Sequence, residues 1–262
     1  MPELISIGKC LYCNEEFTIA TITRHLNKHL ASKTGASKAG KSFLIKVETS
    51  KRWGNAPYFL QLWVDGDIAM EELDDFLRAI WLDCCGHMSS FTNPAARKKG
   101  APMWDFFEAE NLLAKGKIKE YEKLMEDSNG DIPMSKKAKD ALQKGLKLEY
   151  EYDFGSTTAL QVIIFEEYAI KADESIVLLS RNEPPEILCE TCGVKPAVKL
   201  CTVCMYNGEA TFCKDCAKKH GKTCDDFNDY AALPVVNSPR MGVCGYDGGS
   251  IDKKRDGVFV KK

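Results

Sequence analysis

The chain has 262 residues, of which 44% are hydrophobic and 28% charged, and its net charge at neutral pH is −2. This length allows one sizeable core with small modules beside it, and the composition is ordinary for a globular protein. The sequence has no apolar run of membrane-spanning length and no signal-peptide pattern at its start, which argues against a membrane protein and favours a cytoplasmic one.

Cysteine is abundant, with twelve residues. A secreted disulfide scaffold would explain such a number, but most of these cysteines stand at zinc-ligand spacings and the chain is long enough to build a core. A reducing compartment keeps thiolates free for metal, which again favours the cytoplasm.

Charge is unevenly distributed along the chain. Residues 1–53 carry a net charge of +5, residues 54–181 carry −8 and residues 182–262 carry +1. A basic N-terminal end can contact nucleic acid, but a lysine-bearing, solvated linker explains the charge equally well.

The first expected module, residues 1–30, contains the pattern C-x2-C-x11-H-x3-H, formed by Cys10, Cys13, His25 and His29. The two histidines are four residues apart, so both face one side of a helix and can bind one zinc ion. Phe17 and Ile22 stand between the two ligand pairs, where a small core is expected. The segment therefore resembles the two-Cys-two-His zinc fingers, although its central spacing is one residue shorter than usual.

In that family the base-contacting positions would fall on Thr18, Thr21 and Arg24. Only arginine among these is a strong reader of guanine, and one finger covers about three base pairs, too few for a specific site. We therefore favour a protein contact, or non-specific contact with nucleic acid, over sequence-specific DNA binding.

Residues 31–41 are small, polar and lysine-bearing, which predicts a flexible linker to a central domain over residues 42–183. In that domain, apolar residues at helical spacing predict a helix over 68–84 with acidic residues in its first turns. Alternating apolar residues predict strands at 43–49, 58–64, around Phe91, and at 147–154, 158–169 and 175–180. Further helices are expected at 104–126, broken at Gly116, and at 136–143, capped by Ser135.

Two motifs in the central domain carry a family resemblance. The first is Gly86-His87-Met88 with Phe91 after the helix, and the second is the run YEYDFG at 150–155. With the order of elements, they resemble the plasmid Ri open-reading-frame-three-like family, also labelled insertion-element passenger TnpR-like proteins, over residues 43–181. The resemblance implies an α+β domain with a twisted, mainly antiparallel sheet and packed helices, and it implies no established activity.

The chain departs from that family directly after the YDFG run. The family usually continues with D-x-W-x-H, and here Ser156, Thr158 and Leu160 occupy those places. The aromatic residues Tyr150, Tyr152 and Phe154 lie at strand spacing, which we interpret as core packing rather than as a platform for stacking bases.

His87 is the histidine that the zinc patterns do not use. A nucleophilic site would pair it with Cys84 or Cys85, with Asp83 or Asp153 orienting the ring. No nucleophile, base and orienting group stand together at a recognisable spacing, so we predict that the protein is not an enzyme. Cys84 lies on the apolar stripe of the helix and is expected to be a buried structural thiol.

The most informative stretch lies within residues 186–228. It reads C-x2-C-x8-C-x2-C-x8-C-x2-C-x3-H-x3-C, with the ligands Cys189, Cys192, Cys201, Cys204, Cys213, Cys216, His220 and Cys224. Eight soft donors are what two tetrahedral zinc ions need. With four ligands for each ion, no position stays open for catalysis, so the sites are expected to be structural.

These eight ligands can be wired in two ways. Sequential wiring gives the first four to one ion and the last four to the other. Cross-braced wiring gives Cys189, Cys192, Cys213 and Cys216 to one ion, and Cys201, Cys204, His220 and Cys224 to the other. We favour the cross-brace because four ligands within the twelve residues 213–224 leave little chain to wrap an ion. The ligand order resembles B-box, MYND and HIT-type fingers, although the last spacings differ from each.

The remaining residues, 229–262, are a turn-rich tail. Turn residues within 233–249 predict an ordered cluster packed on the domain, and the last residues are expected to fray. Cys244 has no partner by spacing and is expected to be a free thiol.

The sequence therefore predicts an α+β protein flanked by two small zinc-binding modules, with three zinc ions in total. Its expected function is non-enzymatic, with structural zinc modules presenting surfaces to a protein partner and with no membrane contact. One alternative is a nucleic-acid-binding regulator associated with a mobile element. Another is a hydrolase or transferase with a site near His87 and Asp153.

Overall fold

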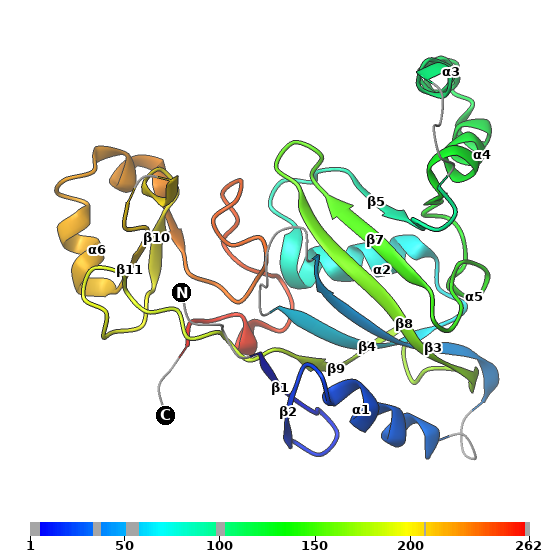
Figure 1. Cartoon of the computed structure of the whole chain (residues 1–262), viewed down its shortest axis with the longest axis horizontal. Helices are drawn as coiled ribbons and strands as arrows, with labels where there is room; N and C mark the ends of the chain where they lie inside the picture. The colour runs from blue at the N-terminus through cyan, green and yellow to red at the C-terminus, as the bar shows by residue number, and fades with distance from the viewer. Residues whose placement is uncertain (1–5, 34–37, 51–57, 98–102, 207, 260–262) are drawn as a thin grey trace.

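A seven-stranded sheet forms the centre of the computed structural model, which describes residues 6–33, 38–50, 58–97, 103–206 and 208–259 (Figure 1). Its strands are β3 (Ala39–Thr49), β4 (Phe59–Asp65), β5 (Ser89–Thr92), β6 (Asp131–Ile132), β7 (Lys147–Tyr152), β8 (Thr158–Ile170) and β9 (Ile176–Arg181). They lie in the order β6-β5-β7-β8-β3-β4-β9, and each neighbouring pair is antiparallel. This confirms the predicted α+β class with an antiparallel central sheet.

Helix α2 covers one face of this sheet (Figure 1). It spans Met70–Leu77 and continues as a π-helical turn, η2 (Arg78–Leu82), close to the predicted helix over 68–84. Its apolar residues recur at helical spacing, so they form one stripe that the sheet buries completely. The stripe consists of Met70, Leu73, Leu77, Ile80 and Trp81.

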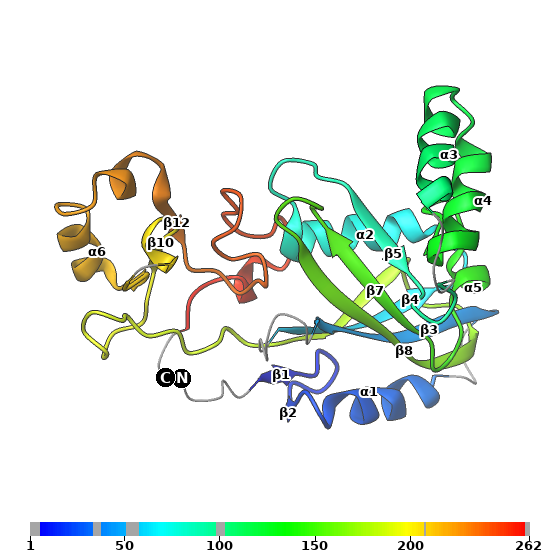
Figure 2. The same ribbon diagram turned by 45° about the horizontal axis from the view of Figure 1, so that its top comes forward.

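Two other helices, α3 (Met103–Ala114) and α4 (Ile118–Asn129), form a hairpin that stands away from the sheet (Figure 2). The chain turns between them at Gly116, as the sequence predicts. Helix α5 (Ala138–Ala141) is shorter than expected, and its N-cap is Lys137, so the prediction that Ser135 caps it is wrong. No described helix has both the length and the apolar character that spanning a bilayer needs.

The N-terminal module covers the opposite face of the sheet (Figure 2). It consists of the hairpin β1 (Ile7–Lys9) and β2 (Glu16–Thr18) and of helix α1 (Ile22–Ala31). Leu26 and Leu30 of α1 are fully buried. They share a core with the strand residues Leu44, Phe59 and Trp63. Strand β4 is therefore buried on both faces along its whole length.

Hydrogen bonds also fasten this module to the sheet. The side-chain amide of Gln61 donates to Thr23 Oγ1 over 2.9 Å within the core. The expected flexible linker over 31–41 needs correction, because α1 continues to Ala31 and β3 already begins at Ala39. Residues 34–37 of that linker lie outside the described residues. The finger is thus part of the central layer structure and not a module on a long tether.

One predicted core residue lies at the surface. Tyr150 and Tyr152 of β7 are fully buried, as expected, but Phe154 is 52% exposed. Asp153 has φ of +64°, a left-handed conformation that ends the strand and breaks the alternation of side chains. The prediction that Phe154 belongs to the core is therefore wrong.

The C-terminal module is built on a second, three-stranded antiparallel sheet (Figure 1). Its elements are β10 (Lys199–Cys201), η3 (Cys204–Tyr206), β11 (Thr211–Phe212), α6 (Lys214–His220), η4 (Phe227–Ala231) and β12 (Ala232–Pro234). Its small core combines cysteine side chains with Phe212 and Phe227. So few apolar residues form a weak core, which is typical of modules that depend on bound metal.

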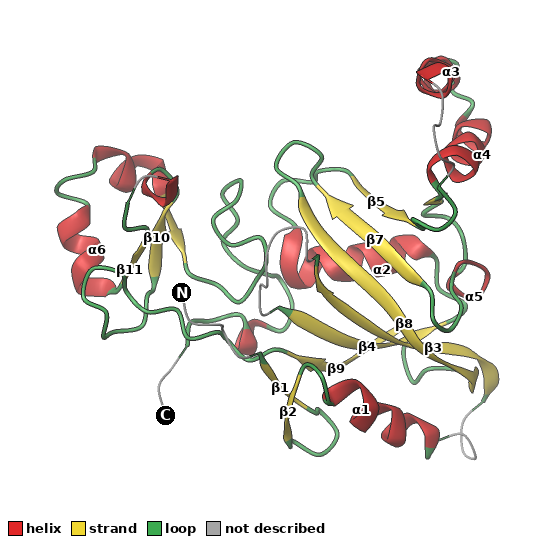
Figure 3. Cartoon of the chain, in the orientation of Figure 1, coloured by secondary structure: helices red, strands yellow, loops and turns green. Residues whose placement is uncertain are grey.

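Because β12 pairs with β10, the C-terminal module extends to Pro234, and the tail is the segment after β12 instead of residues 229–262. This tail lies between the module and the central domain and is mostly loop (Figure 3). Its residues Asn237, Ser238 and Arg240 are buried, and Ser238 Oγ donates to the Trp81 carbonyl over 2.6 Å. This confirms the prediction of an ordered turn cluster on the domain. The expected fraying of the last residues is contradicted at Asp256, which is buried directly after η5 (Lys253–Arg255), and residues 260–262 lie outside the described residues.

Candidate metal centres

The four predicted ligands of the N-terminal module converge. The ligand atoms of Cys10, Cys13, His25 and His29 all lie within 4.8 Å of one another. The two cysteines come from the turn between β1 and β2, where Asn14 N–H donates to the Cys10 carbonyl over 2.8 Å. The two histidines come from one face of α1, and their Nε2 atoms are 3.0 Å apart. The structure thus brings together the four side chains that the sequence predicts as ligands of one ion.

The eight C-terminal ligands form two groups. Cys189, Cys192, Cys213 and Cys216 make one group, and Cys201, Cys204, His220 and Cys224 make the other, each with ligand atoms within 4.8 Å. This grouping is the cross-braced one that the spacing favours. The sequential alternative does not describe the structure.

The hairpin of β10 and β11 explains the cross-brace. Glu190 N–H donates to the Thr211 carbonyl over 2.9 Å, which brings Cys189 beside Cys213 at one end of the hairpin. Cys201 lies at the other end, where its N–H donates to the Ala210 carbonyl over 2.8 Å. Helix α6 then carries the chain across, and His220 reaches the second group.

Aromatic rings hold His220 in place. The Phe212 ring stacks on it with a centroid distance of 4.2 Å, and the Phe227 ring meets it edge-on at 4.9 Å. In the N-terminal module Phe17 stacks on His25 in the same way, at 4.0 Å. Packing on both sides of an imidazole fixes its orientation before any ligand binds, so the ring is preorganised.

The thiols of the four-cysteine group cannot all ionise together without a cation. Burial, together with the neighbouring Cys213 and Cys189, raises the pKa of Cys216 to about 12. At Cys189 burial acts in the same upward direction, but backbone N–H groups of Cys213 and Cys192 outweigh it, and its pKa falls to about 6. The thiol of Cys189 therefore ionises readily, whereas Cys216 retains its proton. A bound dication would stabilise both as thiolates.

The donor sets suit zinc. They are two cysteines with two histidines, four cysteines, and three cysteines with one histidine, which are the combinations that structural zinc sites use. Each group offers four ligand atoms, enough to complete a tetrahedron. Each of these clusters can hold a metal ion.

A fourth group of ligand-type side chains lies outside these modules. Cys84, Cys85, His87 and Cys244 have ligand atoms within 4.8 Å of one another. Cys84 packs against the core as expected but is only partly buried. Cys244 is a free cysteine as expected, but its Sγ lies 3.3 Å from His87 Nε2, a contact that the sequence does not predict. More than 150 residues separate Cys244 from the others, so spacing carries no sign of the contact. The C-C-x-H run at residues 84–87 contains three of the four side chains, and it is the one signal of this site in the sequence.

The geometry at His87 is unlike that of a catalytic triad. His87 Nε2 lies 3.0 Å from Cys85 Sγ and 3.5 Å from Asp153 Oδ2. In a triad the nucleophile and the acid occupy opposite nitrogens of the ring, whereas here both face the same nitrogen. Asp153 is instead bound to Arg240, whose Nη2 donates to Oδ2 over 2.6 Å, and this bond holds the pKa of Asp153 at about 2.

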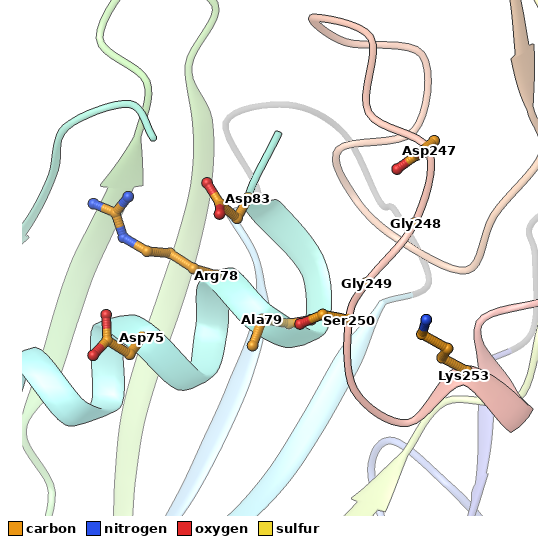
Figure 4. Close-up of a pocket in the computed structure, with 9 residues that line it drawn as sticks. All are labelled: Asp75, Arg78, Ala79, Asp83, Asp247, Gly248, Gly249, Ser250 and Lys253. Atoms are coloured by element: carbon orange, nitrogen blue, oxygen red, sulfur yellow. The ribbon is translucent and has the colours of Figure 1, made fainter. Parts of the chain in front are cut away.

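A polar cavity of about 380 Å³ lies between η2 and the tail (Figure 4). Asp75, Arg78 and Asp83 form its helix side, and Asp247, Ser250 and Lys253 belong to the tail side. Neither His87 nor Asp153 lines it. The cavity therefore does not connect the two residues that the enzymatic hypothesis needs.

Comparisons with known proteins add little. No protein-family model and no curated protein matches the chain. One similar solved structure is that of the protein of unknown function MM3350 from Methanosarcina mazei Go1. It shares 14% sequence identity over 54% of this chain and 68% of that chain, with a TM-score of 0.36. A likeness of this extent supports no conclusion about the fold or the function.

Proposed function

We propose that this chain is a zinc-binding, non-enzymatic interaction protein whose structural zinc modules present binding surfaces. The observation that carries the proposal is the convergence of twelve cysteine and histidine side chains into three groups of four. Zinc with four protein ligands has no open position for water or substrate, so its role is to hold the fold. A reducing cytoplasm suits such thiolate-rich sites.

The C-terminal module offers a surface for a protein partner. Tyr206 and Tyr230 are 82% and 68% exposed, and Val203 and Met205 beside them are also exposed. A hydrogen bond of 3.0 Å from Thr202 N–H to the Ala231 carbonyl brings these two segments together. Tyrosine is enriched at the centres of protein interfaces because it combines a large apolar ring with a polar tip. This exposed aromatic group supports a protein partner for the module.

Metal analysis tests the zinc part of the proposal. The full chain, purified without chelators, is expected to hold at least the three zinc ions of these groups. Cys13→Ser, Cys192→Ser and Cys204→Ser, one for each group, each remove a ligand and are expected to lower the zinc content by one ion. Zinc content below two ions per chain, or content unchanged in all three variants, contradicts the proposal.

Quantitative affinity capture tests the surface. With the full chain as bait, Tyr206→Asp combined with Tyr230→Asp is expected to weaken binding of the captured partner about tenfold or more, since aromatic residues dominate such interfaces. Val194→Asp is the matched control, because Val194 is a similarly exposed apolar residue of the same module, 78% exposed, on a different turn. Equal losses in both variants would show that the tyrosines have no special role. The size of each loss is then measured as the change in Kd between the purified partner and each variant.

A nucleic-acid-binding regulator is the second candidate, and helix α1 favours it. Thr21, Arg24 and Lys28 form the exposed face of α1, while the opposite face is buried on the sheet. The resemblance to the TnpR-like family is what links such a regulator to a mobile element. Binding to DNA or RNA that weakens steeply as salt rises, and weakens further in Arg24→Ala with Lys28→Ala, would favour this candidate. If the chain does not bind DNA or RNA even at low salt, this candidate function is excluded.

A further inference from the structure

Four side chains at the junction of the central domain and the tail are grouped as closely as the ligands of the three predicted sites. Cys84, Cys85 and His87 follow directly after η2, and Cys244 comes from the tail. Cys85 Sγ lies 3.7 Å from Cys84 Sγ and 3.8 Å from Cys244 Sγ. His87 Nε2 lies 3.0 Å from Cys85 Sγ and 3.3 Å from Cys244 Sγ.

The two sulfur–sulfur distances fit ligands around one ion. Zinc–sulfur bonds of about 2.3 Å at tetrahedral angles place two sulfurs about 3.8 Å apart, which both sulfur pairs match. A disulfide needs about 2.05 Å between sulfurs, far less than either separation. A single imidazole nitrogen forms one hydrogen bond at a time, so hydrogen bonding alone does not account for two sulfurs in contact with Nε2.

The backbone is shaped to aim these side chains inward. Gly86, between two of them, has φ of +75°, and its N–H donates to Asp83 Oδ1 over 3.1 Å. Cys244 itself has φ of +50°, a conformation that costs energy for any residue with a side chain. Gly86 thus provides, without strain, the turn between Cys85 and His87, whereas Cys244 holds an uncommon conformation at the position of its own side chain.

Arg240 places a positive charge beside one of the sulfurs of this group. Its side chain is fully buried, and Nη2 lies 3.5 Å from Cys84 Sγ while also donating to Asp153. Three thiolates and a neutral imidazole around a dication carry one net negative charge, and a guanidinium beside a ligating sulfur offsets it. Arg240 also donates to the Ser156 carbonyl over 2.9 Å, which anchors it to the sheet.

We propose that Cys84, Cys85, His87 and Cys244 bind a fourth zinc ion, which clamps the C-terminal tail to the central domain. The three ligands that follow η2 belong to the domain, and the fourth belongs to the tail, which is mostly loop. Two of its three cysteines, Cys85 and Cys244, are exposed, whereas Cys192 is the one exposed cysteine of the C-terminal groups, so this ion exchanges with solvent chelators sooner than the C-terminal ions.

Zinc content measured by mass spectrometry tests the proposal. The full chain is expected to hold four zinc ions, one for each group of ligands, and Cys244→Ser is expected to hold three. Met88→Ala is the matched control: Met88 adjoins His87, its side chain is 70% exposed, and it offers no ligand in this group, so four ions are retained. Amide exchange within residues 240–248 is expected to rise in Cys244→Ser and to stay unchanged in Met88→Ala.

A second variant separates metal loss from misfolding. Cys244→His restores a ligand, and histidine tolerates the left-handed conformation of this position better than most residues. It is expected to regain the fourth ion and, after replacement of zinc by cobalt, to show a weaker thiolate charge-transfer band than the wild-type chain.

Three outcomes overturn the proposal. They are a wild-type content of three ions that Cys244→Ser leaves unchanged, a Cys85–Cys244 disulfide in protein purified under mildly reducing conditions, and failure of Cys244→His to regain the ion. The Cys13→Ser, Cys192→Ser and Cys204→Ser variants test the three other zinc ions, and the Cys244 variants test only the fourth. Failure of this proposal can therefore be told apart from failure of the proposed function.

Discussion

Arg181 shows how one side chain can join distant parts of the chain. It is fully buried at the end of β9. Its Nη2 donates to Asp256 Oδ1 and to the Asn237 carbonyl, both over 2.5 Å, and its Nη1 lies 3.3 Å from Asp252 Oδ2. A buried guanidinium is stable only when it is paired. Because the partners of Arg181 belong to the tail, these contacts hold the end of the tail on the sheet.

Loss of one carboxylate partner of Arg181 is expected to lower the stability of the protein. Asp256→Ala leaves Arg181 buried with the Asn237 carbonyl and with Asp252, at 3.3 Å, as its one remaining carboxylate partner, and the free energy of unfolding is expected to fall by about 3 kcal/mol. Asp247→Ala, at an exposed aspartate of the same tail, is expected to change it by less than about 0.5 kcal/mol. Urea denaturation measures both values. Similar effects of the two substitutions would show that the ion pair does not hold the tail.

Helix α1 has two roles at the scale of elements. One face presents His25 and His29 to the N-terminal cluster, and another buries Ile22, Leu26 and Leu30 against the sheet. The tyrosine hydroxyl of Tyr168 on β8 donates to Asn27 Oδ1 over 2.6 Å, which adds a directional contact. The finger is therefore an integral layer of the fold as well as a candidate metal site.

Truncation of the buried face is expected to destabilise the whole domain. Leu26→Ala removes a fully buried side chain shared by α1 and the sheet, and the free energy of unfolding is expected to fall by about 3 kcal/mol. Lys28→Ala, at an exposed position of the same helix, is the control and is expected to have little effect. If Leu26→Ala melts only the finger while the sheet unfolds at an unchanged denaturant concentration, the two are not one cooperative unit.

The whole molecule consists of one large domain, a small C-terminal module and a tail between them (Figure 1). The central domain has an extensive apolar core on both faces of its sheet. The C-terminal module has few apolar residues besides its cysteines. Its stability is therefore expected to depend on metal, whereas the central sheet depends on burial of apolar surface.

Several parts of this organisation are visible in the sequence because they depend on local spacing. Paired cysteines two residues apart and the i, i+4 histidines identify the candidate ligands, since one turn or one helix face brings such pairs together. Alternation and helical periodicity identify β7, β8 and α2. Apart from Gln61, the run Tyr58–Val64 is apolar on both sides, which is a sign of burial on both faces. No local pattern shows which segment covers each face.

What only the tertiary structure decided are the contacts between segments far apart in the chain. The docking of α1 on β3 and β4 depends on the shape of the assembled sheet, and the cross-brace depends on which end of the β10–β11 hairpin each cysteine reaches. Cys244 meets Cys85 and His87 only because the tail folds back across the end of η2. Spacing along a chain reports neighbours within a turn or a helix, and it carries no information about the long-range packing that brings these side chains together.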